Sequence, residues 1–242
     1  METRHEFDQY ATSYESLHND NVSMVGADSH EFLMAKLAFC ERFVRTHQMP
    51  SNGDGKVFLD YGCGTGRLGH VFHDCFDPVW TYVGVDPSVD SIKEARGHHP
   101  DPVLLHRPVR YRTLDEWRQE HEVYDFALAA CVFHHIVPAA RPAALRSVWE
   151  RLKPGGTFAI WEHNPWNPIT RRIVDACSFD KGAILLSLPE MKSVWDSLGL
   201  KSVIGDSYVT FFPGPLRSLV PLERWLGWLP LGGQWVFWAR KL

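Results

Sequence analysis

The sequence contains a glycine-rich turn, Asp60-Tyr61-Gly62-Cys63-Gly64-Thr65-Gly66, between a short apolar segment at residues 57–60 and a helical pattern at residues 67–76. Such a turn needs glycine because glycine accepts a positive φ and lets a ligand come close to the backbone. The helix that follows offers free N–H groups and the positive end of its dipole at the same point. A strand, a glycine turn and a helix in this order predict the ligand-binding corner of an α/β fold.

Strand-like and helix-like segments alternate after this turn. Strands are expected at residues 81–86, within 103–111, at 125–130 and at 157–161, and helices at 88–96 and 142–151. This alternation predicts a parallel sheet with helices on both faces, which binds ligands at the carboxyl ends of its strands. Two further strands are expected at residues 207–212 and 234–240. The segment that joins them is too long for a tight hairpin.

Length and composition indicate one globular domain. The 242 residues fit an α/β domain with a small additional part, and the net charge of -4 argues against a broad nucleic-acid-binding face. The five cysteines are odd in number and widely spaced, which predicts no disulfide framework and a reducing cytoplasm. The first residues are too polar for a signal peptide, and no apolar run approaches the roughly 18 residues that span a bilayer. We therefore expect a soluble, cytoplasmic protein without nucleic acid as a partner and without stable membrane insertion.

Two kinds of ligand fit the glycine turn. Residues 64–69 match GxGxxG, the dinucleotide fingerprint, and Asp60–Gly66 is an acidic GxGxG turn. In the dinucleotide motif a glycine follows the strand directly, whereas here Asp60 stands at the strand end. A carboxylate there would repel a pyrophosphate but suits the ammonium of a methionine moiety. We therefore interpret Gly69 as a helix-packing residue. Asp86, which ends the second strand, can accept both ribose hydroxyls of either ligand, or it can cap the next helix.

Five short motifs follow one another in a fixed order over residues 55–162. They are the Asp60–Gly66 turn, Gly84-Val85-Asp86-Pro87-Ser88, Tyr124-Asp125-Phe126, His134-His135-Ile136 and Leu152-Lys153-Pro154-Gly155-Gly156. On these motifs the chain resembles the class I (Rossmann-like) S-adenosylmethionine-dependent methyltransferases. The resemblance implies a doubly wound α/β sheet of seven mostly parallel strands, whose last pair contains a reversed strand. It also implies S-adenosylmethionine as the cofactor.

The resemblance further implies which residues hold this cofactor. They lie in the glycine turn, at the end of the second strand and after the fourth strand, and they are Asp60, Gly62, Cys63, Gly64, Gly66, Asp86, Pro87, Ala130 and Cys131. Residues 1–54 are expected to form a helical segment and lid, in which Tyr14 closes over the cofactor. Asp115 is a candidate for contact with the adenine amine, or else it belongs to the start of a helix.

Methyl transfer is an in-line displacement, so holding the nucleophile in line with the methyl group supplies much of the catalysis. An oxygen or nitrogen acceptor that carries a proton can also need a general base, for which histidine is suited. His134 and His135 follow the fourth strand, and His163 follows the fifth. A packing or turn role is favoured for His135. His163 is the better candidate for the base and His134 the second, while Glu162 is a candidate for a buried carboxylate that orients a neighbour.

The segment after the fifth strand contains two Asn-Pro steps, which hold the chain extended, and a helix is expected to start near Pro168. Residues 163–187, approximately, are expected to form part of a cap over the acceptor within a methyltransferase domain that spans residues 55–242. Arg171 and Arg172 either bind an anionic acceptor group or form a solvated helix face. No HExxH, CxxC or aspartate cluster with ligand spacing is present, so no metal site is expected.

Four tryptophans, Trp225, Trp228, Trp235 and Trp238, cluster with leucines near the end of the sequence. They either line an apolar acceptor channel, contact a membrane surface, or pack the last strands. The leading hypothesis is an S-adenosylmethionine-dependent methyltransferase that modifies oxygen or nitrogen of a small apolar or anionic acceptor in a biosynthetic pathway, with carbon methylation left open. The alternatives are a NAD(P)-dependent oxidoreductase and a methyltransferase fold that binds the cofactor without methyl transfer. The sequence does not predict the acceptor or the oligomeric state.

Overall fold

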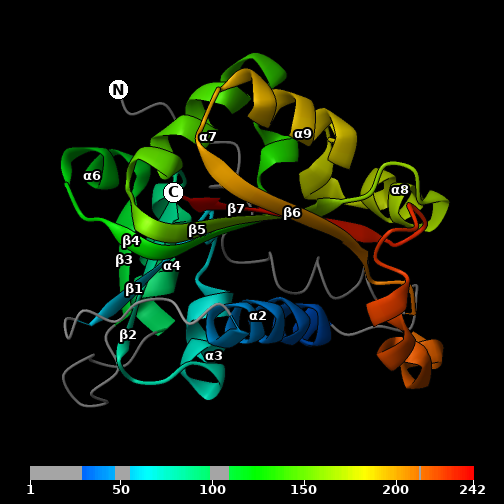
Figure 1. Ribbon diagram of the computed structural model, residues 1–242. Coiled ribbons are helices and arrows are strands. Elements are labelled where there is room, and N and C mark those ends of the chain that lie inside the picture. The colour runs from blue at the N-terminus through cyan, green and yellow to red at the C-terminus, as the bar shows by residue number, and fades with distance from the viewer. Residues whose placement is uncertain (1–28, 47–54, 99–108, 213) are drawn as a thin grey trace.

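The computed structural model of the chain describes residues 29–46, 55–98, 109–212 and 214–242, and it is built around one seven-stranded sheet (Figure 1). The strands lie in the order β3-β2-β1-β4-β5-β7-β6. The five strands from β3 to β5 are parallel, and β7 runs antiparallel to both of its neighbours. The predicted doubly wound, mostly parallel α/β sheet with one reversed strand is therefore confirmed.

The strands are β1 (Lys56–Tyr61), β2 (Trp80–Asp86), β3 (Val109–Thr113), β4 (Tyr124–Ala130), β5 (Leu152–His163), β6 (Ser202–Val209) and β7 (Gln234–Lys241). The α-helices of the described residues are α2 (Ser29–Thr46), α3 (Arg67–Cys75), α4 (Val89–His98), α6 (Leu114–Gln119), α7 (Arg141–Glu150), α8 (Pro168–Ala176) and α9 (Leu188–Ser197). Short 3-10 helices are η2 (Phe133–His135), η3 (Pro138–Ala140), η4 (Ser178–Asp180) and η5 (Gly214–Trp225).

The sheet separates two buried apolar clusters, because alternate residues of each strand point to opposite faces. Phe58 packs on the face covered by α2, α3 and α4, while its neighbour Leu59 packs on the face covered by α6, α7 and α9. Figure 1 shows α2 and α3 below the sheet and α7 and α9 above it. Both faces of the sheet are therefore covered by apolar packing, so polar side chains that bind a ligand are expected at the ends of the strands.

Three strands differ from their predicted bounds by two residues or more. The fifth spans Leu152–His163, where residues 157–161 were expected. The third strand lies at Val109–Thr113, at the late end of the predicted range and two residues beyond it. The sixth lies at Ser202–Val209 instead of residues 207–212. It ends where β7 begins, since Val209 pairs with Gln234. Beyond it, Thr210 has a φ of 63° and the carboxylate of Glu223 accepts the N–H groups of residues 210–212, so these groups do not join the sheet.

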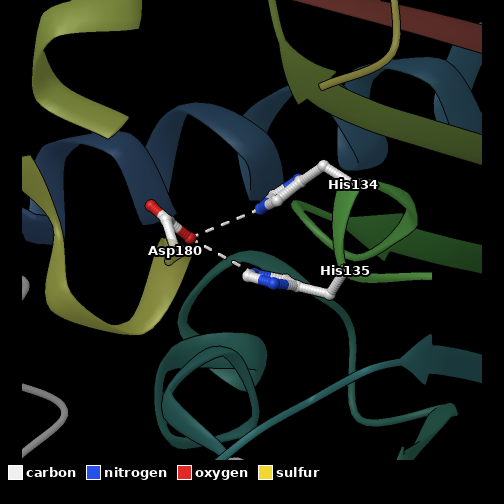
Figure 2. Close-up of side chains that lie close together, drawn as sticks. All are labelled: His134, His135 and Asp180. Carbon is white, nitrogen blue, oxygen red and sulfur yellow. Dashed lines mark ion pairs between the residues drawn. The ribbon is translucent and has the colours of Figure 1, made fainter. Parts of the chain in front are cut away.

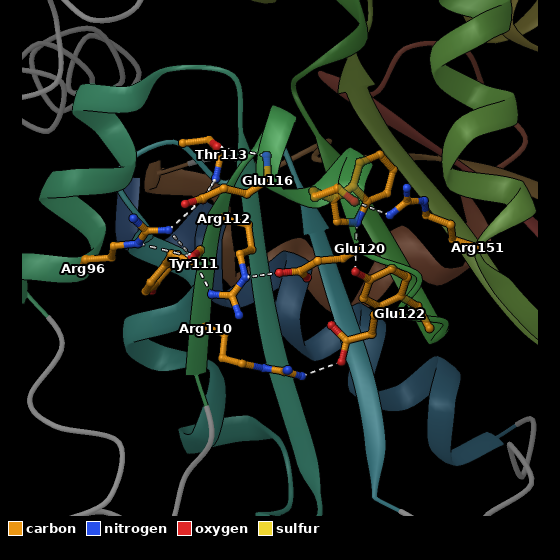
Figure 3. A network of polar contacts seen from close by, with 11 residues as sticks. Arg96, Arg110, Tyr111, Arg112, Thr113, Glu116, Glu120, Glu122 and Arg151 are labelled. Carbon is orange, nitrogen blue, oxygen red and sulfur yellow. Dashed lines mark hydrogen bonds and ion pairs between the residues drawn. The ribbon is translucent and has the colours of Figure 1, made fainter.

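A network of arginine and glutamate side chains ties β3 to α4, α6 and the segment before β4 (Figure 3). Arg96 donates to the Tyr111 carbonyl at 2.9 Å and to Glu116 at 2.8 Å. Glu116 also completes a capping box with Thr113 at the start of α6. The remaining pairs are Arg110 with Glu122 and Arg112 with Glu120. Because most of these groups are partly exposed, each pair adds at most about 1 kcal/mol, but together they fix the position of α6.

Candidate functional site

The glycine turn between β1 and α3 has the backbone that its sequence predicts. Gly62, Gly64 and Gly66 have φ values of 83°, 53° and 77°, which favour glycine. A Cβ on Gly62 would lie 2.4 Å from Cγ2 of Val132, whereas a Cβ on Gly64 would meet nothing within 4 Å. Gly62 therefore lets the loop after β4 approach, and Gly64 leaves backbone open to a ligand.

Gly69 lies one turn into α3, where the helix crosses two aromatic side chains. A Cβ there would lie 2.3 Å from the hydroxyl of Tyr111 and 2.8 Å from the ring of Tyr82. The same hydroxyl donates to the carbonyl of Gly66 at 3.1 Å. This contact agrees with the interpretation of Gly69 as a packing residue.

Asp86 ends β2 beside the glycine turn and holds two backbone groups. Its Oδ2 accepts the N–H of Gly64 at 2.9 Å, and its Oδ1 accepts the N–H of Ser88 at 2.8 Å. The first turn of α4 is capped by the hydroxyl of Ser88, which accepts the N–H of Ser91. Asp86 therefore shapes the turn without being the cap itself, and it still borders the open space described next.

A cavity of about 610 Å³ opens at the carboxyl ends of β1, β2 and β4. It is bordered by backbone of the glycine turn, by the end of β2, by the loop after β4 and by α7. Six of the residues predicted to hold the cofactor line it: Gly62, Gly64, Asp86, Pro87, Ala130 and Cys131. Its volume falls in the range of about 300–1,000 Å³ that is usual for small-ligand sites.

The other predicted cofactor residues lie elsewhere. Asp60, Cys63 and Gly66 are buried behind the turn and do not border the cavity. Tyr14 lies outside the described residues, as does most of the predicted lid. Asp115 is exposed in the first turn of α6 and pairs with Arg118, whose side chain lines the cavity. The geometry therefore favours the second interpretation of Asp115, in which it belongs to the start of a helix.

Asp60 is held by a buried tyrosine. The hydroxyl of Tyr82 donates to Oδ2 of Asp60 at 2.5 Å, and Asp60 is only 3 % exposed. Burial raises the pKa of Asp60 to about 6, although the Tyr82 hydrogen bond and the charge of Lys36 act in the opposite direction. A carboxylate with this pKa is ionised at neutral pH and can hold a cation, while mild acid neutralises it.

Lys36 is a polar residue of this site that the sequence interpretation missed. Its Nζ lies 3.8 Å from Sγ of Cys131, at the end of β4. Cys131 has a φ of 59°, a left-handed conformation that is uncommon outside glycine and is often found at functional sites. A signal was present, because Lys36 falls in the same helical stripe as the buried Leu37 and Cys40.

His134 is sandwiched between two carboxylates. Its Nδ1 lies 2.5 Å from Oε2 of Glu162, and its Nε2 lies 3.5 Å from Oδ1 of Asp180. The other oxygen of Glu162 accepts the N–H groups of Val132 and Phe133 at 2.8 and 2.6 Å. Glu162 is thus a buried carboxylate that orients a neighbour, one of the roles considered for it. Burial lowers the pKa of His134, but the attraction of Glu162 and Asp180 outweighs it and raises this pKa well above its ordinary value.

His135 and His163 lie on either side of His134. Nε2 of His135 is 3.3 Å from Oδ1 of Asp180, and His135 lines the cavity. The ring of His163 has its centre 5.2 Å from that of His134. Burial and the neighbouring charge of His134 lower the pKa of His163 to about 4. At neutral pH, His163 is therefore uncharged with a free lone pair, whereas protonated His134 can donate a proton but cannot accept one.

Comparison with known proteins identifies the fold. A family model described as a methyltransferase domain matches residues 59–158, which include the glycine turn, Asp86 and the His134–His135 loop. Residues 59–158 therefore form a methyltransferase domain, set in a Rossmann-like α/β fold. Solved structures with this fold include a protein described as a SAM dependent methyltransferase from Archaeoglobus fulgidus and a Haemonchus contortus methyltransferase in complex with S-adenosyl-L-methionine. The dinucleotide interpretation of the glycine turn is thereby set aside.

Curated relatives of this methyltransferase cover only part of its length. The mitochondrial ubiquinone biosynthesis O-methyltransferase of Bos taurus is 30% identical over 122 residues, which is 49% of this chain and 32% of the bovine protein. The human protein of the same description is 31% identical over 109 residues, 44% of this chain and 28% of its own length. The matched part is thus about a third of these relatives.

Solved structures share the fold over most of the chain. A methyltransferase from Thermotoga maritima aligns with 98% of this chain and 99% of its own at 17% identity, with a TM-score of 0.59. The methyltransferase bound to the Haloferax volcanii Trm112 activator covers 98% of both chains at 17% identity, with a TM-score of 0.63. At these identities the likeness shows the fold alone.

The segment after β5 of this methyltransferase is anchored through its two asparagines. Asn164 donates to the carbonyls of Pro230 and Gly232 at 3.1 and 2.8 Å. Asn167 caps α8 by accepting the N–H groups of Ile169 and Thr170 at 3.0 Å, and α8 begins at Pro168 as predicted. The Asn-Pro steps therefore join the expected cap segment to the loop before β7.

The clustered tryptophans have different surroundings. Trp235 is fully buried in β7, while Trp225 and Trp228 are 58 % and 76 % exposed. Packing of the last strands accounts for Trp235 and for Trp238, which packs against Phe39 and Phe43 of α2, but not for Trp225 and Trp228. Arg171 and Arg172 are also exposed, on α8. Among the helices of the described residues, none combines the length and apolar character of a membrane span.

Proposed function

We propose that this methyltransferase transfers the methyl group of S-adenosylmethionine to an oxygen or nitrogen of a small molecule in a biosynthetic pathway. The observation that carries the proposal is the continuity of one cavity, which runs from Asp86 on β2 past Cys131 to His135 and α7. In this arrangement Asp86 receives the ribose hydroxyls, and the backbone of Gly62 and Gly64 borders the cofactor. The far end of the cavity is left for the acceptor.

Among the acceptor atoms we favour oxygen. The relatives that match residues of this domain are described as O-methyltransferases, although they share only part of their length with this chain. A hydroxyl acceptor must lose its proton during transfer, and we assign the role of base to His163, which is half-buried and neutral at pH 7. Because His163 does not border the cavity, this role requires an acceptor that reaches past His135 toward the end of β5. We assign His134 a positioning role, since it holds its place between Glu162 and Asp180.

The nature of the acceptor and the cell compartment complete the proposal. Exposed apolar residues of η5 and the exposed arginines of α8 favour an acceptor with an apolar or anionic part. The five cysteines are all free thiols, which supports the cytoplasm as the compartment. We place the lid in residues 1–54, where α2 already packs on α3, and the cap in residues 163–187.

The experiment uses S-adenosylmethionine with a labelled methyl group and a metabolite extract as the source of acceptors. We expect the label to move to a small molecule and S-adenosylhomocysteine to form in equal amount. Label in protein or nucleic acid would contradict a small-molecule acceptor. Tight cofactor binding without any transfer would instead support the methyltransferase fold that only binds the cofactor.

A further inference from the structure

Two histidine rings and one carboxylate meet at a single point between η2 and η4. Figure 2 shows the ring edges of His134 and His135 facing the same oxygen of Asp180. That oxygen lies 3.5 Å from Nε2 of His134 and 3.3 Å from Nε2 of His135. The three donor atoms all lie within 4.8 Å of one another.

The two nitrogen–oxygen distances are long for hydrogen bonds and suit a shared cation. An N–H···O hydrogen bond usually spans about 2.7–3.2 Å. Ligands about 2.0–2.1 Å from a tetrahedral metal ion are separated from one another by about 3.3–3.4 Å. The distances of 3.3 and 3.5 Å to Asp180 match this ligand-to-ligand separation.

The contact between His134 and Glu162 determines which ring nitrogen of His134 faces Asp180. Oε2 of Glu162 lies 2.5 Å from Nδ1 of His134 and accepts its N–H, which leaves Nε2 as the inner atom. A bound ion would replace the proton that Nε2 carries in the metal-free protein, and this proton would be released to solvent. Histidines that bind a metal usually donate their other ring N–H to a carboxylate or carbonyl. Glu162 is itself fixed by the backbone of Val132 and Phe133. The orientation of His134 is therefore set by its surroundings.

The segments that carry the three donors are bound to each other. The N–H of Ile184 donates to the carbonyl of His134 at 2.8 Å. The buried Arg141 donates to the carbonyls of Phe133, Ile136 and Ile184 and so joins the loop after β4 to the segment that follows Asp180. A site held in this way needs little rearrangement to bind an ion.

We propose that His134, His135 and Asp180 bind a divalent transition-metal ion of the zinc class. Two imidazole nitrogens and one carboxylate oxygen suit Zn²⁺, or Co²⁺ in its place, better than Mg²⁺ or Ca²⁺, which prefer oxygen alone. The side chain of His135 is 22 % exposed and borders the cavity of about 610 Å³, so a fourth position can be filled by water or an acceptor oxygen. The sequence predicted no metal because Asp180 lies 45 residues after His135, outside any short spacing rule.

The direct test is a titration of the chelator-treated protein with Co²⁺, followed by visible absorption, and with Zn²⁺, followed by calorimetry. We expect one ion per chain and the strong d–d bands of a tetrahedral site. A thiolate-to-cobalt charge-transfer band would overturn this ligand set, because it would make a cysteine such as Cys131 a ligand. Absence of stoichiometric binding would also overturn the proposal.

Variants of the proposed ligands test which residues bind the ion. Asp180→Asn and His135→Gln should each weaken Zn²⁺ binding by at least about tenfold. The matched controls are Asp175→Asn and His121→Gln. Asp175 and Asp180 line the same second cavity, which is separate from the cofactor cavity, and His121 is an exposed histidine before β4. Unchanged Zn²⁺ affinity in both ligand variants would refute the site. S-adenosylmethionine binding by Asp180→Asn checks folding, because Asp180 does not border the cofactor cavity. The failure of the metal site and the failure of the proposed function can therefore be distinguished.

Discussion

The hydroxyl of Tyr82 on β2 donates a 2.5 Å hydrogen bond to the carboxylate of Asp60 on the neighbouring strand β1. This pair lies directly behind the glycine turn, and Lys36 and Asp86 are the other charged groups that act on Asp60. The sequence motif marks Asp60 as a partner for the ammonium of the cofactor. In the structure, its first partner is a tyrosine and it does not border the cavity, so Asp60 acts on the cofactor ammonium through its charge and not by direct contact.

The affinity for S-adenosylmethionine should depend on pH through Asp60. Its pKa is raised to about 6, so the carboxylate is ionised above that pH and attracts the cofactor ammonium. As the pH falls through 6, the carboxyl group takes up a proton and the attraction is lost. We expect Kd, measured by calorimetry, to rise by up to about tenfold for each pH unit below 6. Asp60→Asn should weaken binding at pH 7 and flatten this dependence; an equally steep dependence in the variant would show that another group titrates.

Removal of the Asp86 carboxylate should weaken cofactor binding. Asp86→Ala deletes charged hydrogen bonds to the ribose, which are worth about 1.5–3 kcal/mol, and also frees the N–H groups of Gly64 and Ser88. Kd should therefore rise by roughly ten- to a hundredfold, with a small loss of thermal stability. Asp90→Ala, which removes an exposed carboxylate from α4, is the control. Equal affinity in the two variants would mean that a different acidic residue binds the ribose.

A side chain at Gly62 should disrupt the turn. Gly62→Ala forces a methyl group to within 2.4 Å of Val132 at a φ of 83°, and we expect a loss of about 1–3 kcal/mol of unfolding free energy in denaturant titrations. Val132→Ala in the same chain should restore part of it, because the clash is then removed while the strained φ remains. By contrast, Gly97→Ala in α4 meets nothing within 4 Å and should stabilise the protein by about 0.5–1 kcal/mol.

His163→Gln should lower turnover and leave cofactor affinity nearly unchanged, because His163 is assigned to the acceptor and does not border the cavity beside the glycine turn. A general base typically contributes about 10²–10⁴-fold to the rate. The measurement is kcat with the acceptor found in the labelling experiment, alongside Kd for the cofactor. His121→Gln serves as the control for loss of a histidine far from the site. Normal turnover in His163→Gln would reduce this residue to a packing role.

Local patterns were sufficient to predict the central strands and the turn. Phe58 and Leu59 of β1 and residues 126–129 of β4 are buried, and each group belongs to a short apolar run that is visible in the sequence. The bounds of β6 were wrong because pairing with β7 sets them, and because Glu223 removes the N–H groups of residues 210–212 from the sheet. Neither cause is visible in residues 202–212 alone.

The candidate site was predicted where it lies on the strand ends and missed where it depends on distant segments. Gly62 and Gly64 come just after β1 and Asp86 ends β2, so the alternation of the fold places them at one edge of the sheet. Lys36 reaches that edge from α2, and Asp180 reaches His134 from a segment beyond α8. Contacts of this kind depend on tertiary packing, so the spacing of residues in the sequence does not predict them.

The position of β7 has a consequence for how the chain is made. β7 (Gln234–Lys241) lies between β5 and β6, although it is synthesised after both. While the ribosome is still translating β7, β6 has no neighbour to pair with, and the apolar face later covered by Trp235 and Phe237 is open. β7 therefore has to insert between two strands that precede it in the chain, and without it one edge of β5 and both edges of β6 would be unpaired and prone to aggregation.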